Sequence, residues 1–167
     1  MATTQDVRDS KIPLDATADG EVARHLNEFL RGEISAVETY RMAIEKVTHR
    51  GDEGNNSLGL LREIQEAHGR AAQALRDRVR EVGSDPSDAS GLWGVWAKTV
   101  QGTANLLGDT AALKSLKEGE EHGLKDYKEK LPDLDTTSAE LVQNQLIPAQ
   151  IRHVSILDQL LNAIGRA

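Results

Sequence analysis

Four residue types that can do chemistry recur in a fixed pattern in the two halves of this sequence. A glutamate is followed by a tyrosine seven positions later, and further along a glutamine is followed by a histidine three positions later. The first set consists of Glu33, Tyr40, Gln65 and His68, and the second of Glu120, Tyr127, Gln150 and His153. The glutamate and the histidine are 35 residues apart in the first set and 33 in the second. This repeat predicts two similar helical hairpins, each carrying one glutamate and one histidine.

Helical geometry predicts that these polar side chains share one layer. Residues seven apart in an α-helix lie two turns apart on nearly the same side, and residues three apart lie on one face. Each polar residue falls between apolar residues of its own helix: Glu33 between Leu30 and Val37, His68 between Leu61 and Leu75, Glu120 between Leu116 and Leu124, and His153 between Leu146 and Leu157. A buried carboxylate is costly unless an ion or hydrogen bonds compensate it. We therefore expect the four side chains to converge where the hairpins meet.

Two carboxylates and two imidazoles are a suitable ligand set for one divalent metal ion, such as zinc or ferrous iron. The predicted metal ligands are Glu33, His68, Glu120 and His153. Four further residues are expected beside them, as weak ligands or as hydrogen-bonding neighbours of the ligands: Gln65, Gln150, Tyr40 and Tyr127. The same residues also suit a hydrogen-bonded polar core that holds no metal. The pattern alone leaves both interpretations open.

Apolar periodicity predicts the helices that position these residues. Steps of three and four residues predict long helices over about 19–51, 57–83, 110–131 and 138–164, the last with a kink near Pro148. A short extra helix is expected around 91–107. Residues 1–18 are polar and lack periodicity, which predicts a flexible N-terminal arm before a single bundle at 19–165. No stretch has the alternation of a strand, so the predicted fold class is all-α, an antiparallel four-helix bundle of two helical hairpins.

These features resemble the ferritin-like four-helix-bundle superfamily and, more specifically, bacterial domain-of-unknown-function family 2383. The stretch LNEFLRGEISA at 26–36 is similar to the first helix of bacterioferritins, in which the corresponding glutamate is a metal ligand. Three further stretches are similar to family 2383: the Gln-x-x-His helix that ends at Gly83, the segment GLWG at 91–94, and the spacing from Gly119-Glu120 to Tyr127. The resemblance implies a ferritin-like bundle with its site between the helices, and it implies no particular activity.

The sequence departs from the ferritin-like pattern at Gln65 and Gln150. Ferritin-like dimetal sites have Glu-x-x-His twice, and that glutamate bridges two metal ions, whereas a neutral amide is a poor bridge. We therefore expect about one iron or zinc ion per chain, without strong catalytic activity. Two alternatives are a structural or partner-binding bundle with a vestigial polar core and no metal, and a diiron oxidase or ferroxidase, the activity expected if the chain is an enzyme.

The composition limits the other classes of function. A formal net charge of -7, with basic and acidic residues interspersed, argues against a nucleic-acid partner. The absence of cysteine excludes disulfides and thiolate metal sites. The first residues lack an apolar secretory segment, and no apolar run approaches the ~20 residues of a membrane span, so we expect a cytoplasmic protein without a membrane partner. A homodimer is the expected assembly.

Other acidic residues and histidines on the same helices lie off the apolar stripes. Glu66, for example, precedes Arg70 by four residues, the spacing of a surface ion pair. We expect six of these residues in solvent: Glu38, Glu63, Glu66, His25, His49 and His122.

Overall fold

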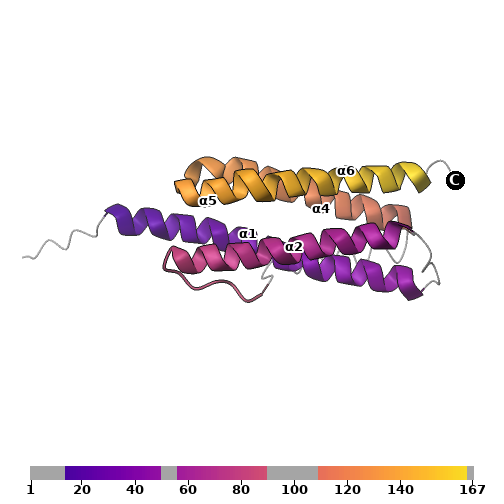
Figure 1. Ribbon diagram of the computed structural model, residues 1–167, viewed down its shortest axis with the longest axis horizontal. Helices are drawn as coiled ribbons and strands as arrows, with labels where there is room; N and C mark the ends of the chain where they lie inside the picture. The colour runs from indigo at the N-terminus through magenta and orange to yellow at the C-terminus, as the bar shows by residue number, and fades with distance from the viewer. Residues whose placement is uncertain (1–13, 50–55, 90–108, 165–167) are drawn as a thin grey trace, which may run out of the picture.

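Four long helical segments lie side by side as two antiparallel hairpins (Figure 1). The computed structural model describes residues 14–49, 56–89 and 109–164. One hairpin pairs α1 with α2, and the other pairs α4 with a final segment of three consecutive parts. The elements are α1 (Leu14–His49), α2 (Asn56–Glu81), α4 (Asp109–Lys130), the 3-10 helix η1 (Leu131–Asp133), α5 (Thr136–Leu141), the π-helix η2 (Val142–Leu146) and α6 (Ile147–Ile164). No strand occurs among the described residues, and the predicted all-α four-helix bundle is confirmed.

The helix boundaries lie within a few residues of the predicted ones. The largest difference is at the start, because α1 begins at Leu14 and residues 14–18 of the predicted arm are helical. α2 ends in a left-handed turn at Gly83, whose φ is 77°. The amide of Ser84 donates to the carbonyl of Val79 and that of Gly83 to Arg80, which satisfies the last carbonyls of the helix. The rest of the predicted arm and the predicted helix around 91–107 lie outside the described residues.

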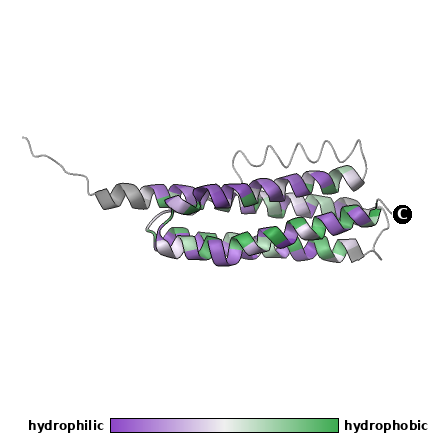
Figure 2. Cartoon of the chain, turned by 90° about the horizontal axis from the view of Figure 1, so that it is seen from above, coloured by the Kyte–Doolittle hydropathy of each residue, from purple (hydrophilic) through white to green (hydrophobic). Residues whose placement is uncertain are grey.

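The core consists of two apolar clusters on either side of the predicted polar layer. One cluster includes Leu26, Leu30, Leu75, Val79 and Val142, all fully buried or nearly so. The other gathers further along α1, nearer the starts of α2 and α4 and the end of α6, around Tyr40, Ile64, Leu116, Leu157 and Leu160. Hydrophilic and hydrophobic residues are mixed along the helices (Figure 2), as expected for helices with one buried face.

The final segment contains a π-helix instead of a simple proline kink. Its buried positions are Ser138, Val142, Leu146, Gln150, His153, Leu157 and Leu160. From Ser138 to Gln150 these positions are four residues apart three times in succession, and only after Gln150 does the spacing alternate between three and four residues. Each step of four in a regular α-helix turns the buried face by about 40°. The wider π turn absorbs this rotation, and the amide of Ile147 donates to the carbonyl of Val142 five residues back. As a result, the residues after Pro148 face the same core as those before it.

Within the described part of the chain, none of the helices combines the length and the apolar composition needed to cross a membrane. The cytoplasmic location and the homodimer stay predictions.

Candidate metal centre

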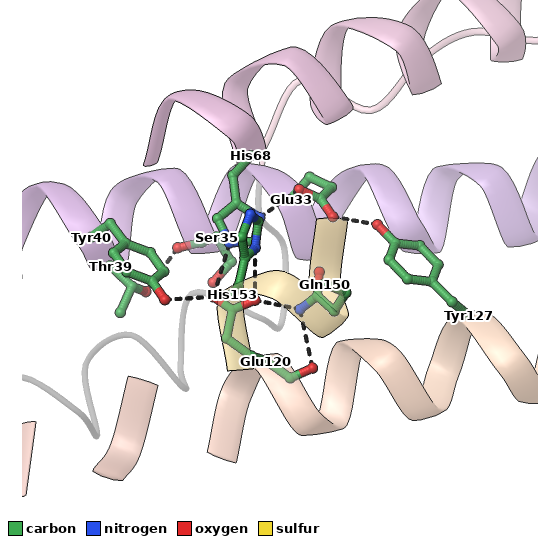
Figure 3. A network of polar contacts seen from close by, with 9 residues as sticks. All are labelled: Glu33, Ser35, Thr39, Tyr40, His68, Glu120, Tyr127, Gln150 and His153. Carbon is green, nitrogen blue, oxygen red and sulfur yellow. Dashed lines mark hydrogen bonds and ion pairs between the residues drawn. The ribbon is translucent and has the colours of Figure 1, made fainter. Parts of the chain in front are cut away.

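Each of the four long helical segments contributes one side chain to a buried cluster between the two apolar clusters (Figure 3). Glu33 comes from α1, His68 from α2, Glu120 from α4 and His153 from α6, and each side chain lies in the core, with at most 5% of the residue exposed. The convergence predicted from the sequence repeat is therefore observed. The assignment of these residues as metal ligands stays a prediction.

His68 occupies the centre of the cluster and contacts both carboxylates. Its Nδ1 lies 2.7 Å from Glu33 Oε2, and its Nε2 lies 2.9 Å from Glu120 Oε1. Burial alone lowers the pKa of this ring, but the charges of Glu33 and Glu120 outweigh burial and raise the pKa of His68 to about 10. At neutral pH the ring is thus an imidazolium that donates to both glutamates. The protonated ring of His68 thus supplies the positive charge between the two buried carboxylates.

Glu120 accepts more hydrogen bonds than any other member of the cluster. Tyr40 Oη donates to its Oε1 at 2.6 Å, Gln150 Nε2 donates to its Oε2 at 2.5 Å, and His153 Nδ1 lies 3.2 Å from Oε2. Burial alone raises the pKa of Glu120, but the charge of His68 and the hydrogen bonds from His153 and His68 lower it to about 2. Glu120 is therefore a carboxylate held by four side chains.

The two tyrosines connect the hairpins. Tyr40 of the first hairpin donates to Glu120 of the second, and Tyr127 of the second donates to Glu33 of the first. The sequence places each tyrosine two turns from the glutamate of its own helix, but its hydroxyl reaches the glutamate of the other hairpin. Burial and the neighbouring carboxylates raise the pKa of both phenols well above the ordinary value. Both tyrosines are therefore neutral donors.

The two glutamines are not equivalent. Gln150 donates to the side chain of Glu120 and, at 3.0 Å, to its backbone carbonyl. Gln65 is half-buried and donates to the backbone carbonyl of Val37 at 3.2 Å. Gln150 therefore lies beside the cluster as predicted, whereas the amide of Gln65 donates to the backbone of α1. The sequence repeat alone does not reveal this difference.

The two histidines also differ. His68 uses both ring nitrogens, but His153 has a hydrogen bond only at Nδ1. Its Nε2 is buried and has no hydrogen-bond partner among the described residues. With Nδ1 bonded to Glu120, the lone pair of Nε2 is free to bind a cation. One ligand atom from each of His68, Glu120 and His153 can be chosen so that the three lie within 4.8 Å of one another, so these residues fit one metal ion.

The other acidic residues and histidines mostly lie where the sequence places them. Glu38, Glu63, Glu66 and His122 are exposed, and Glu66 lies 3.9 Å from Arg70. The side chain of His49 lies outside the described residues. His25 was expected in solvent, and this expectation is wrong because the residue is only 7% exposed. It packs beside Arg24 and Glu28, and Asp133 of η1 lies at 4.0 Å, so the turn after α4 covers a residue that α1 alone would expose.

Fold and site together define a four-helix bundle with a buried glutamate and histidine cluster built by two similar hairpins. A family model described as Domain of unknown function (DUF2383) matches residues 21–133, and the chain belongs to this family. The match includes Glu33, His68 and Glu120 and ends before Gln150 and His153. Comparison with curated proteins and with solved structures gives no match. The predicted family is thus confirmed, and the fold is compatible with the wider ferritin-like superfamily.

Folding stability is expected to decrease at alkaline pH because folded His68 binds its proton more tightly than unfolded His68. Its pKa rises from 6.5 to about 10, so its contribution is complete below pH 6.5 and is lost as the pH rises toward 10. The steepest decline is about 1.4 kcal/mol per pH unit. The pKa of Glu120 falls from 4.5 to about 2, so its contribution is present above pH 4.5 and is lost toward pH 2.

Urea unfolding of the metal-free protein across this pH range measures the effect. The His68→Gln variant is the control and should lose most of the alkaline decline. An equally steep decline in that variant would assign it to another group.

A methyl group at Gly123 is expected to disturb Glu120 indirectly. A Cβ at this position would lie 3.0 Å from Gln150 Nε2, so the amide must shift by a few tenths of an ångström, which disturbs its short hydrogen bond to Glu120. We expect Gly123→Ala to destabilise the protein by about 1–2 kcal/mol despite the better helix propensity of alanine. Gly32→Ala is the matched control: its Cβ meets nothing within 4 Å, and the change should stabilise by roughly 0.5–1 kcal/mol. Equal gains in urea unfolding for both variants would contradict this role of Gly123.

Proposed function

We propose that this chain binds one divalent metal ion, iron or zinc, in the core of the bundle, without strong catalytic activity. The main support is the buried group of His68, Glu120 and His153, in which one ligand atom of each residue lies within 4.8 Å of the others. In addition, His153 Nε2 is buried and has no hydrogen-bond partner among the described residues. A buried polar atom without a hydrogen bond costs about 1–3 kcal/mol of stability. Coordination of a cation by this nitrogen would remove this cost.

The charges of the cluster suit one divalent ion. Glu33 and Glu120 together supply two negative charges, and in the metal-free protein the proton on His68 compensates one of them. A divalent ion would displace that proton, so metal affinity should rise with pH. Tyr127 would continue to hold Glu33, while Tyr40 and Gln150 would hold Glu120. A bound ion of this kind supplies Lewis acidity or, if it is iron, electron transfer.

The two glutamines favour one ion over two. A second ion needs further negative ligands, and the side chains at 65 and 150 are neutral amides. Gln150 also directs its NH2 group at Glu120, so it acts as a donor to a ligand and not as a ligand itself. A diiron oxidase is therefore the less supported proposal.

A metal-free polar core is the second candidate, and a specific observation favours it. Protonated His68 already satisfies both carboxylates, at 2.7 and 2.9 Å, without any metal. In this interpretation the imidazolium of His68, and not a metal ion, supplies the positive charge between the carboxylates. The two candidates differ in what they expect of His153: it is a ligand in the metal site, whereas in the polar core it donates one of several hydrogen bonds to Glu120.

Titration of the untagged, chelator-treated protein with zinc or, without oxygen, with ferrous iron tests the proposal. We expect about one ion per chain. His153→Leu should weaken binding by more than about 100-fold, because it removes a ligand. In the metal-free protein the same variant removes the unpaired Nε2 but also the hydrogen bond from Nδ1 to Glu120, so these two effects oppose each other and stability should change far less than metal affinity.

His122→Leu provides the matched control, since His122 is an exposed histidine on α4. It should leave both affinity and stability nearly unchanged. If the parent protein binds no metal at micromolar concentrations, the polar-core function replaces the metal site.

A further inference from the structure

A cavity of about 80 Å³ lies between α1 and α4 and reaches the cluster. Its polar lining includes Glu33, His68 and Glu120 of the cluster. Its walls include small residues on both helices, among them Gly32 and Ala36 of α1. The volume corresponds to two or three water molecules at roughly 30 Å³ each. The cavity is thus large enough for a small ligand and too small for most organic substrates.

Glu33, His68 and Glu120 all line the cavity, whereas His153 does not. The rings of His68 and His153 pack against each other, with centroids 4.8 Å apart. An ion bound by His68, Glu120 and His153 has three protein ligands, and a fourth coordination position is then available. Because His68 and Glu120 line the cavity and His153 does not, the side left for this position is the cavity.

We propose that the cavity between α1 and α4 is the position at which a small external ligand, of two or three non-hydrogen atoms, binds the metal ion. This inference depends on the proposed metal site. A divalent ion with Glu33 and Glu120 is neutral overall, and the cavity walls include Phe29 and Leu116. The ligand is therefore neutral or carries at most one charge, because every charge on it is uncompensated in the core and a second would add a further large cost.

Azide, a linear anion of three atoms, is a suitable probe, with cobalt(II) in the metal site as a spectroscopic reporter. Azide should change the visible absorption of the cobalt-loaded protein saturably, and inorganic phosphate should not. Ala36→Leu and Gly32→Leu place a larger side chain in the cavity wall. Each should weaken azide binding at least tenfold while cobalt affinity changes less than about threefold.

Gly69→Leu is the matched control. Gly69 is exposed, follows His68 on α2, does not line the cavity, and has nothing within 4 Å of an added Cβ. This variant should keep both affinities.

Bound cobalt with no azide response, or an azide response that survives both leucine substitutions, would overturn the inference and leave the metal site intact. A parent protein that binds no cobalt would overturn the metal site and, with it, this inference. A response to phosphate as strong as that to azide would overturn the proposed ligand size and charge.

Discussion

Replacement of His68 by alanine is expected to destabilise the metal-free protein by about 3–5 kcal/mol, because it leaves two buried carboxylates without their cation. Glu33 and Glu120 are 5% and 3% exposed, so water cannot take the place of the imidazolium without opening the bundle. Urea unfolding at neutral pH measures the loss. His122→Ala, which removes an exposed histidine, should change the stability by less than about 0.5 kcal/mol.

Neutralising the carboxylates should reverse much of this loss. In the His68→Ala background, Glu33→Gln together with Glu120→Gln removes the unpaired charges and retains groups that the tyrosines can contact. We expect this triple variant to be more stable than His68→Ala alone. If it is less stable, the damage from His68→Ala comes from the empty volume and not from buried charge.

The second large effect is expected from Gln65→Glu combined with Gln150→Glu, which restores Glu-x-x-His in both hairpins. Gln150 Nε2 lies 2.5 Å from Glu120 Oε2, so a carboxylate at 150 would face another carboxylate at contact distance. Without metal, Gln150→Glu should destabilise by about 3 kcal/mol. Gln65→Glu should cost less, because Gln65 is half-buried and contacts a backbone carbonyl. Unfolding of the two single variants without metal separates these contributions.

With metal, the double variant should gain a second ion and oxidise ferrous iron faster than the parent, since a dimetal reaction needs bridging negative ligands. Metal stoichiometry and oxygen consumption are the measurements. A parent protein that already binds two irons and turns over rapidly would show that the glutamines do not limit the site. Equal destabilisation of the two single variants without metal would contradict the difference between Gln65 and Gln150.

The convergence of the cluster was predictable because it depends on spacing within helices. A glutamate or histidine inside an apolar stripe must face the core, and two hairpins with the same stripe must bring their polar positions together. Glu33, His68, Glu120 and His153 meet for this reason. Their chemistry is less determined, because the same four residues serve a metal site or a polar core.

The features that the sequence did not predict depend on contacts between helices. Tyr40 and Tyr127 cross to the opposite hairpin because of the way that the hairpins face each other, which no spacing within one helix specifies. The different hydrogen bonds of Gln65 and Gln150 depend in part on Gly123, whose missing side chain lets Gln150 approach Glu120. The π-helix did leave a signal, since the run of four-residue steps from Ser138 to Gln150 does not fit a regular α-helix.

The crossed tyrosine bonds select one alignment of the two hairpins. Tyr40 with Glu120 and Tyr127 with Glu33 tie the hairpins together at two points, with His68 bridging the two glutamates. Two surfaces of leucine and valine can slide past each other by one helical turn, about 5.4 Å, and still bury similar apolar area. In this bundle the same slide would break both tyrosine bonds and move charged glutamates against aliphatic side chains. The polar layer therefore disfavours the neighbouring registers of the two hairpins, which a purely aliphatic core would tolerate.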